Sequence, residues 1–509
     1  MPALPTTRKW LKFSRHLFLG IGVLYLLLAS SAALTTAPFP NEAWFASPAL
    51  NLYRHGFMGT TILESTGTWF AGIDRHTYWV PPGYFLVQAV WYWCFGPGLI
   101  AARASSLLFG LLVLYSTYCF TRRLSGSRAA GFIASLLLAS DYRFVHYGAN
   151  GRMDMMCAGL GFAGLAAYLG LRKRSFPLAL AIGHGLASAS CLTHACGVLY
   201  AVGLLLLILF LDRENLKVKW LFLVAAPYLL GLAAWGVYIA KDPGSFRSQF
   251  LGNVSGISAE LGKESRFSGL RQPVQALRHE VGSRYLANFG RWAKWGDPLG
   301  QQLAVLALYI IGIAGAILIP RLFHHTGTKL LMTLGAAFGL IFWLLEGTRT
   351  SAYLVHTMPV GIAIVAIGLR WWPLAFRREI IIVVVTGACL LNTFALAREF
   401  QRDARGAEYE PVARYMQQHI RPGKLVMASG AFGFRLGFSG EVLDDVRLGQ
   451  LSGKQPDWVI QSKYYAKWAE NSVQREPEIA KAIQQRLSRD FRPVFHNDAY
   501  TVYRSHRLP

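Results

Sequence analysis

The sequence has 509 residues, of which 53% are hydrophobic and 15% are charged, whereas about a quarter of the residues in soluble domains are charged. The formal net charge is +24, but the Lys and Arg residues form short clusters between apolar blocks and do not gather on one face. These patterns exclude a single soluble domain and a nucleic-acid-binding surface. They indicate basic loops that set the topology of a membrane protein.

Apolar blocks recur from residue 17 to residue 397, and each has the length of about twenty residues that a helix needs to cross a bilayer. We expect the first block to stay as a span, because no small-residue cleavage site followed by a soluble domain is present. Keeping the Lys- and Arg-rich loops inside predicts eleven spans and an inward N-terminus. The expected spans are 17–34, 104–120, 129–147, 153–171, 177–192, 195–211, 219–240, 302–320, 330–346, 352–369 and 379–397.

One further apolar stretch, residues 84–95, does not fit into this alternation as a span. It carries the aromatic run Trp91-Tyr-Trp, and such residues concentrate at membrane interfaces. We therefore expect a helix that lies along the interface, bounded by Pro82 and Gly96.

The composition changes after residue 397, where charged residues are frequent and no block is long enough to span. The expected fold is a polytopic α-helical membrane domain, 1–397, with a small α/β domain, 398–509, on the outer face. A first outer loop, 38–100, and a long outer loop, 241–300, reach the same face, and long loops usually cover a site. The expected strands are Lys424–Ala428, Trp458–Gln461 and Tyr500–Tyr503, and the expected helices of this domain are Glu410–His419 and Glu478–Leu487.

Carboxylates are rare in the membrane half, so those at span ends are candidates for function. Glu42 follows the first span, and Asp154 begins the block at 153–171. An acidic residue in the first turn of a helix is also favoured by the helix dipole without any function. For each carboxylate, a functional role and a purely structural role at the helix start are therefore about equally favoured.

Four motifs in order resemble the GT-C membrane glycosyltransferases, in particular the protein O-mannosyltransferase and lipid A aminoarabinose transferase branch. The resemblance covers about residues 15–170 by motifs and the rest by architecture. The motifs are Pro40-Asn-Glu-Ala-Trp, Tyr78-Trp-Val-Pro-Pro-Gly-Tyr, Phe95-Gly with Ala102-Arg and Leu108-Phe-Gly-Leu-Leu, and Arg152-Met-Asp-Met.

The resemblance implies inverting transfer of a sugar from a polyprenyl-phosphate carrier to a lipid, glycan or protein acceptor at the outer face. It places the first-loop acidic pair of the family on Asn41 and Glu42 and the second acidic position on Asp154. The sequence departs from the family at Asn41, where Asp is usual, and at Trp79, where some members carry a metal-binding Glu. A divalent metal ion is the cofactor that the resemblance suggests, and these departures weaken that suggestion.

Phosphate is a good leaving group, so a transferase of this kind needs a base for the acceptor hydroxyl and cations for the phosphate. The resemblance assigns the base to Glu42 and a second carboxylate or cation anchor to Asp154. The amide of Asn41 is expected to hydrogen-bond the sugar, and His76 lies beside Asp74 before the Pro-Pro motif.

Arginines of the long outer loop recur at about seven-residue spacing and suit phosphate binding. Among them, Arg284 is the expected phosphate ligand, with Arg349 of a short outer loop as a further one. A helix solvated by lipid headgroups explains the same spacing and is favoured about three to one. The recurring residues are Arg271, Arg278, Arg284 and Arg291.

Two histidine clusters are not expected to bind metal. Cys191, His194 and Cys196 supply three soft ligands, but a zinc site usually has a fourth, and buried cysteines are common. His324 and His325 fall in an inner loop and are expected to be solvated.

The leading interpretation is a hexosyl- or pentosyltransferase of a bacterial cytoplasmic membrane, with an outward-facing site and a lipid-linked donor. A secondary transporter is the alternative, but the inverted repeats that it predicts are not evident. A non-catalytic membrane scaffold is a third interpretation, which Asn41 favours.

Overall fold

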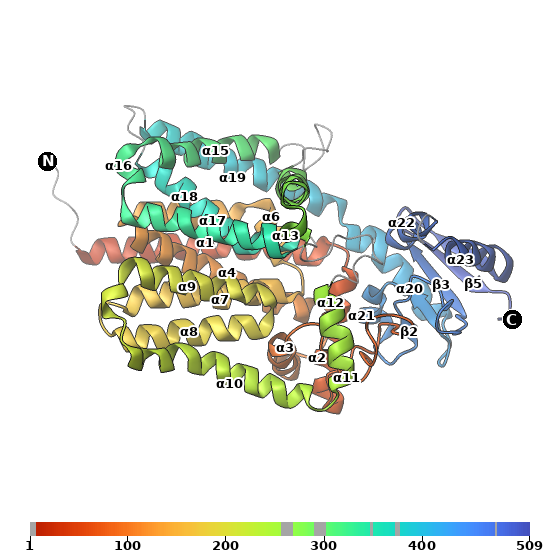
Figure 1. Cartoon of the computed structure of the whole chain (residues 1–509). Helices are drawn as coiled ribbons and strands as arrows, with labels where there is room; N and C mark the ends of the chain where they lie inside the picture. The colour runs from red at the N-terminus through yellow and green to blue at the C-terminus, as the bar shows by residue number, and fades with distance from the viewer. Residues whose placement is uncertain are drawn as a thin grey trace.

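The structure is a computed structural model that describes residues 7–255, 268–289, 302–346, 350–371, 377–473 and 476–508. Long helices run side by side in one bundle, and the C-terminal domain packs at one end of it, called the domain end below (Figure 1). The bundle helices are α1 (Thr7–Thr35), α4 (Leu99–Ser125), α5 (Arg128–Ser140), α7 (Met153–Leu171), α8 (Phe176–Thr193), α9 (Val198–Leu211), α10 (Leu221–Ile239), α15 (Gln302–Leu318), α17 (Thr326–Leu345), α18 (Leu354–Arg370) and α19 (Arg377–Arg402).

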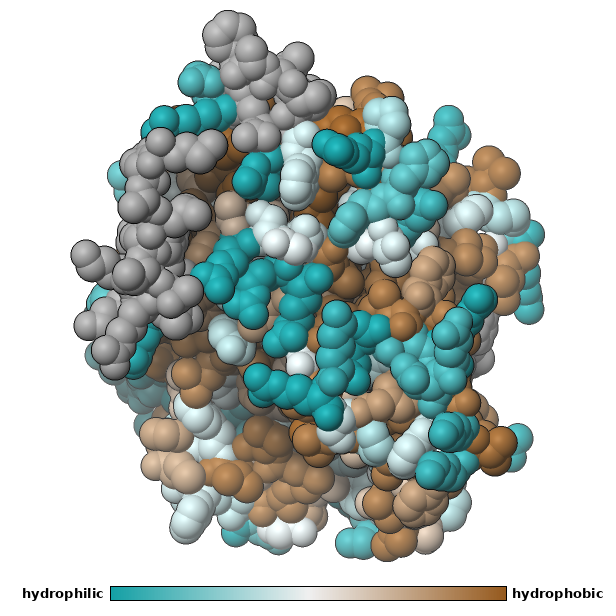
Figure 2. Space-filling view, turned by 90° about the vertical axis from the view of Figure 1, so that its left-hand side faces the viewer, coloured by the Kyte–Doolittle hydropathy of each residue, from teal (hydrophilic) through white to brown (hydrophobic). Residues whose placement is uncertain are grey.

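Eight helices in the described part of the chain are long and apolar enough to cross a bilayer. Three shorter apolar helices coincide with the other expected spans; they are Arg128–Ser140, Ala195–Leu211 and Gln302–Leu318. The total of eleven spans stays a prediction. At the bundle end opposite the domain end, hydrophilic residues gather between apolar ones (Figure 2), including the exposed Arg128, Lys173 and Lys217, as expected for loops on one side of a membrane.

The expected span at 129–147 is interrupted at Asp141. Helix α5 ends at Ser140, and α6 (Tyr142–Gly148) starts anew after the extended residue Asp141. The Asp141 side chain accepts hydrogen bonds from the backbone N–H groups of Arg143 and Phe144, which is the geometry of an N-cap. The apolar pattern predicted one helix because it does not register this break.

Helix α3 (Gly83–Phe95) is separate from α4 and is seen nearly end-on in Figure 1, where the bundle helices run across the view. Pro82 precedes its first turn, and Gly96 ends it with a positive φ of 79°. Thirteen residues extend about 20 Å, which is less than the hydrocarbon core. The prediction of a short helix bounded by these two residues and set across the spans agrees with the structure.

Short helices at the domain end complete the two long loops. The first loop carries α2 (Pro40–His55), and the region between α10 and α15 is largely helical where it is described. The helices between α10 and α15 are α11 (Pro243–Phe246), α12 (Gly252–Ser255), α13 (Ser268–Arg271) and α14 (Pro273–His279), with π-helical turns at Arg247–Leu251 and Glu280–Leu286. A separate short helix, α16 (Pro320–Phe323), lies in the loop between α15 and α17.

The C-terminal domain is a five-stranded mixed sheet in the order β2-β1-β3-β5-β4. β1 pairs in parallel with β2 and β3, whereas β5 is antiparallel to β3 and β4. The three predicted strands and two predicted helices are present; α21, β2, α22 and β4 were not predicted. The elements are α20 (Glu410–His419), β1 (Val426–Ala428), α21 (Gly433–Leu436), β2 (Val442–Leu443), β3 (Trp458–Ser462), α22 (Lys463–Ser472), α23 (Pro477–Asp490), β4 (Phe491–His496) and β5 (Tyr500–Ser505).

The expected domain boundary after residue 397 falls inside α19, which continues to Arg402. The domain docks on the first loop: the Asp444 N–H donates to the Ile62 carbonyl at 2.7 Å, and Lys454 pairs with Glu64 at 2.5 Å. Two segments almost 400 residues apart therefore form one wall at the domain end.

Candidate active site

Glu42 lies in the first turn of α2 and is fully buried. Its two carboxylate oxygens accept from Arg103 Nε and Nη2, both at 2.8 Å. The same oxygens accept from the backbone N–H groups of Gly151, at 2.7 Å, and Phe39, at 2.8 Å. A carboxylate has about four lone-pair positions, so these contacts occupy the whole group.

Burial opposes the ionisation of Glu42, but the charge of Arg103 and the hydrogen bonds outweigh it and lower the pKa of Glu42. Arg103 also donates to the carbonyl groups of Ala33, at 2.7 Å, and Thr36, at 2.9 Å. The pair therefore joins the end of α1, the start of α2 and helix α4 to the α6–α7 connection. These contacts favour a positioning role for Glu42, and its expected role as base stays a prediction.

Asp154 lies in the first turn of α7 and is 3% exposed. Arg152 Nε donates to Asp154 Oδ2 at 2.7 Å. The other oxygen, Oδ1, is buried and has no hydrogen-bond partner among the described residues. Asp154 therefore keeps the free acceptor atom that Glu42 lacks.

The loop before α7 connects the two carboxylates. Gly151 donates to Glu42, and its carbonyl accepts from the Tyr84 hydroxyl at 3.0 Å. A Cβ at Gly151 would come within 2.9 Å of Ala102 Cβ, so only glycine fits here without a shift. The structure thus brings Glu42 and Asp154 to the same end of the bundle through this loop, whereas their sharing of one ligand stays a prediction.

The other residues expected to bind substrate differ in their surroundings. Asn41 is half-buried beside Glu42. The half-buried His76 has its Nδ1 atom 3.8 Å from the carboxylate of Asp242, so its acidic neighbour comes from the long outer loop and not from Asp74.

Arg284 is fully buried between two carboxylates, those of Glu280 and Glu346. Its guanidinium also lies 4.4 Å from the ring centre of Phe342. These contacts neutralise the charge of Arg284 and give it the environment of an internal ion pair, which does not support its expected phosphate contact. Arg271 and Arg278 are exposed, whereas Arg291 and Arg349 lie outside the described residues.

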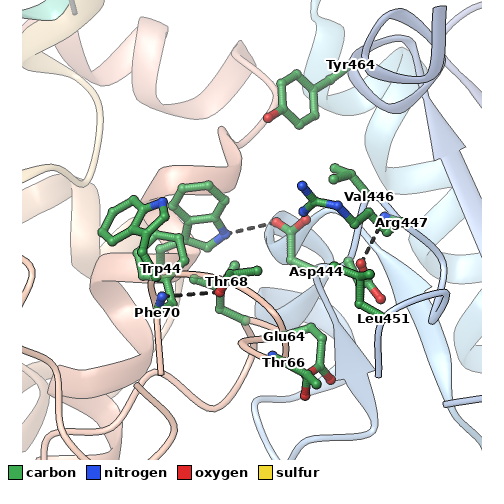
Figure 3. A pocket seen from close by; sticks show the side chains of 13 residues that line it. Trp44, Glu64, Thr66, Thr68, Phe70, Asp444, Val446, Arg447, Leu451 and Tyr464 are labelled. Carbon is green, nitrogen blue, oxygen red and sulfur yellow. Dashed lines mark hydrogen bonds between the residues drawn. The ribbon is translucent and has the colours of Figure 1, made fainter. Parts of the chain in front are cut away.

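A cavity of about 90 Å³ lies between the first loop and the C-terminal domain (Figure 3). Trp44, Trp69 and Phe70 contribute aromatic surfaces, and Asp444 and Arg447 lie on the domain side. Aromatic surfaces with a few polar groups are typical of pockets for small polar ligands.

Asp444 is a buried carboxylate of this cavity. It accepts from Trp44 Nε1 at 2.9 Å, from the Gly430 N–H at 2.7 Å and from the Tyr465 hydroxyl at 2.7 Å. Burial raises the pKa of Asp444 in spite of these hydrogen bonds, and it likewise raises the pKa of the neighbouring Asp445. Acids with shifted pKa values in a cavity are candidates for function.

The expectation that Cys191, His194 and Cys196 do not form a metal site stays a prediction. His194 lies with Cys157 and His356, and one ligand atom from each residue lies within 4.8 Å of the others. Cys157 and His356 were not considered in the sequence because nothing in their local patterns distinguishes them.

Arg103 and Asp444 were also missed as part of the site. The sequence position of Arg103 could have indicated its importance, since a charge within an apolar block is costly unless it is paired. Asp444 follows a two-residue strand in a charged region, and that context is not distinctive.

No protein-family model matches the chain. A segment of 154 residues is 28% identical to the polyprenol-phosphate-mannose–protein mannosyltransferase of Corynebacterium glutamicum and covers 28% of this chain and 27% of that protein. The chain thus matches about a quarter of the length of the curated relative.

Two solved structures are similar over most of the chain. ArnT from Cupriavidus metallidurans bound to undecaprenyl phosphate has a TM-score of 0.62 at 14% identity and covers 98% of both chains. The Archaeoglobus fulgidus oligosaccharyltransferase in complex with Zn and sulfate has a TM-score of 0.54 at 12% identity, covering 91% of this chain and 70% of that one. With its apolar helices and its small C-terminal sheet, the chain is a multi-span membrane protein with the GT-C glycosyltransferase fold.

Proposed function

We propose that the chain transfers a hexose or pentose from a polyprenyl-phosphate-linked donor to a lipid, glycan or protein acceptor, with inversion at the anomeric carbon. The GT-C fold supports this proposal, as does the local similarity to a mannosyltransferase that uses polyprenol-phosphate-mannose. The site faces outward from a bacterial cytoplasmic membrane in this proposal, as the positive-inside rule predicts.

The observation that carries the proposed mechanism is the difference between the two carboxylates. All acceptor positions of Glu42 are occupied, whereas Asp154 Oδ1 has no hydrogen-bond partner among the described residues. We therefore move the role of base from Glu42 to Asp154. A base must reach the proton that it removes, and a free oxygen is the first requirement.

In the reaction, the acceptor hydroxyl oxygen bonds to the anomeric carbon while the bond from that carbon to the phosphate oxygen breaks. The hydroxyl proton goes to Asp154 Oδ1, and the lipid phosphate leaves as an anion. Arg152, which binds Asp154 through Nε, is next to this carboxylate and is proposed to bind the departing phosphate through its Nη atoms. It replaces Arg284, whose charge is already balanced by two carboxylates.

Glu42 then acts as a positioning residue. Its bonds to Arg103 and to the Gly151 N–H hold the loop that leads into Arg152 and Asp154. Asn41, one residue before Glu42, is proposed to hydrogen-bond a sugar hydroxyl. The cavity beside Trp44 and Asp444 is proposed to hold part of the acceptor (Figure 3).

The test is transfer by the purified protein from polyprenyl-phosphate-linked sugars, comparing wild type with Asp154→Asn and with Asp74→Asn. Asp74 is an exposed carboxylate on the first loop and serves as the matched control. We expect Asp154→Asn to lower the rate by about a hundredfold or more, and Asp74→Asn to keep the wild-type rate. Loss of the buried ion pair with Arg152 should also lower the unfolding temperature of Asp154→Asn, so the rates are compared at a temperature at which all three proteins are folded. Normal transfer by Asp154→Asn would refute the assignment, and absence of transfer or hydrolysis by wild type with any such donor would favour the scaffold or transporter interpretations.

A further inference from the structure

Three potential metal ligands from separate helices meet at the domain end of the bundle. Cys157 lies in the second turn of α7, His194 follows α8, and His356 lies in the first turn of α18. All three are buried, with exposed fractions of 0%, 5% and 0%, and one ligand atom from each lies within 4.8 Å of the others. We infer that Cys157, His194 and His356 bind a single zinc-like divalent ion beside Asp154.

The donor set favours zinc over magnesium or calcium. One thiolate sulfur and two imidazole nitrogens are the ligands of zinc sites, whereas Mg²⁺ and Ca²⁺ take oxygen ligands. Bond lengths of about 2.3 Å to sulfur and 2.0–2.1 Å to nitrogen imply ligand atoms about 3.5 Å apart in a tetrahedral site. The ligand atoms are therefore at most about 1.3 Å farther apart than in a tetrahedral zinc site, so the three side chains have to move together by about that amount.

His356 already has the arrangement of a metal-binding histidine. Its Nδ1 atom lies 2.8 Å from the Tyr200 hydroxyl, and its buried Nε2 atom has no hydrogen-bond partner among the described residues. A second contact that holds the far nitrogen is typical of histidine ligands, because it fixes the ring and the tautomer. The proton then resides on Nδ1, and the Nε2 lone pair is available to an ion.

Both ring nitrogens of His194 have hydrogen-bonding contacts. Its Nδ1 accepts from the Cys196 N–H at 3.1 Å, and its Nε2 lies 3.2 Å from the Tyr353 hydroxyl. Both distances are those of ordinary hydrogen bonds, so binding through Nδ1 replaces the contact with the Cys196 N–H by a bond to the ion. The Nε2 proton can then stay with Tyr353, and the ring binds as a neutral ligand.

Asp154 is a buried carboxylate beside this group. It lies three residues before Cys157, which places both on one face of α7, and its charge interacts with both His194 and His356. Its Oδ1 atom has no hydrogen-bond partner among the described residues. The ion therefore has three protein ligands and a fourth position next to Asp154, which is the pattern of zinc sites that keep one open position.

The experiment is a Co²⁺ titration of the full-length protein, purified in detergent after treatment with a chelator, followed by absorption spectroscopy and total metal analysis. We expect one ion per chain and a thiolate-to-cobalt charge-transfer band, because Cys157 binds as the thiolate. Zn²⁺ should displace Co²⁺ and raise the unfolding temperature. These readouts do not depend on sugar transfer.

Two variants test individual ligands, and a third variant is the control. Cys157→Ser and His356→Asn each remove one donor atom, and we expect each to weaken Co²⁺ binding at least tenfold, with the charge-transfer band lost in Cys157→Ser. His356→Asn can still bond the Tyr200 hydroxyl, so the core polar contact is kept. Cys191→Ser, a half-buried cysteine on α8 outside the group, is the control and should bind as wild type does.

Two results would overturn the inference. The first is wild-type protein that binds no ion at one equivalent or shows no thiolate band, which would make the group a hydrogen-bonded polar core. The second is a band that survives in Cys157→Ser and disappears in Cys191→Ser, which would move the ligand to Cys191. Transfer at the normal rate by Asp154→Asn, together with intact metal binding, would leave this inference standing and reject the proposed mechanism alone.

Discussion

The Glu42 carboxylate and the Arg103 guanidinium form a doubly hydrogen-bonded ion pair in which both side chains are 0% exposed. Each partner uses its remaining atoms on backbone groups of α1, α2 or the α6–α7 connection. The pair therefore connects several elements at the domain end, and its removal should lower both the stability of the protein and its transfer activity.

Glu42→Gln should destabilise the protein strongly. The substitution leaves the Arg103 charge buried without a counter-charge, and breaking a buried pair in this way costs about 3–5 kcal/mol. Thermal unfolding in detergent measures the effect. Glu42→Gln combined with Arg103→Met removes both charges and should recover part of the lost stability. An unfolding temperature for Glu42→Gln equal to that of wild type would contradict the positioning role.

Gly151→Ala should lower transfer while leaving membrane insertion intact. The added Cβ meets Ala102 Cβ at 2.9 Å and Glu42 Oε1 at 3.4 Å, so the loop that carries Asp154 must shift. Overpacking of this kind costs about 1–3 kcal/mol. Gly185→Ala is the control, because no atom lies within 4 Å of its added Cβ. Steady-state transfer rates of the two variants give the comparison, and equal rates would show that the loop tolerates the shift.

Asp444→Asn should remove part of the pH dependence of stability. Burial raises the pKa of Asp444 above its usual value of 3.8, so the folded state holds this proton more tightly than the unfolded state does. The stabilisation of the folded state by protonated Asp444 is complete below pH 3.8. It is lost as the pH rises through the raised pKa of Asp444 in the folded state.

We therefore expect the unfolding temperature of wild type to fall relative to that of Asp444→Asn as the pH is raised through this window. Asn keeps an oxygen for Trp44 Nε1 and the Gly430 N–H, and its amide N–H can donate to the Tyr465 hydroxyl, which donates to Asp444 in wild type. Asp498→Asn, at an exposed position, is the control and should track wild type. Parallel curves for wild type and Asp444→Asn would contradict the prediction.

Cysteine labelling tests the predicted topology. In a background with the exposed Cys94 replaced by Ser, Gln455→Cys should react with an impermeant maleimide in intact spheroplasts. Ala129→Cys, at the opposite end of the bundle, should react only after permeabilisation, since the adjacent Arg-rich loop is expected inside. The reverse pattern would invert the protein and place the candidate site on the inner face.

The amino-acid sequence alone was enough to predict features that depend on neighbouring residues. Hydropathy over about twenty residues predicted the bundle helices, and Pro82 and Gly96 correctly bounded the short helix between them. Helical periodicity predicted Glu410–His419, which is α20. Local patterns also located Glu42 and Asp154 in the first turns of their helices, because composition and capping act within a turn or two of the chain.

Only the tertiary structure decided which polar groups pair. Glu42 meets Arg103 across 61 residues, and His194 lies with Cys157 and His356 instead of with the cysteines beside it in the sequence. These partners depend on how the helices rotate and pack, which periodicity does not specify. The same packing encloses Arg284 between two acids and leaves one oxygen of Asp154 without a hydrogen-bond partner among the described residues, because buried charges are stable only where another part of the chain supplies a partner.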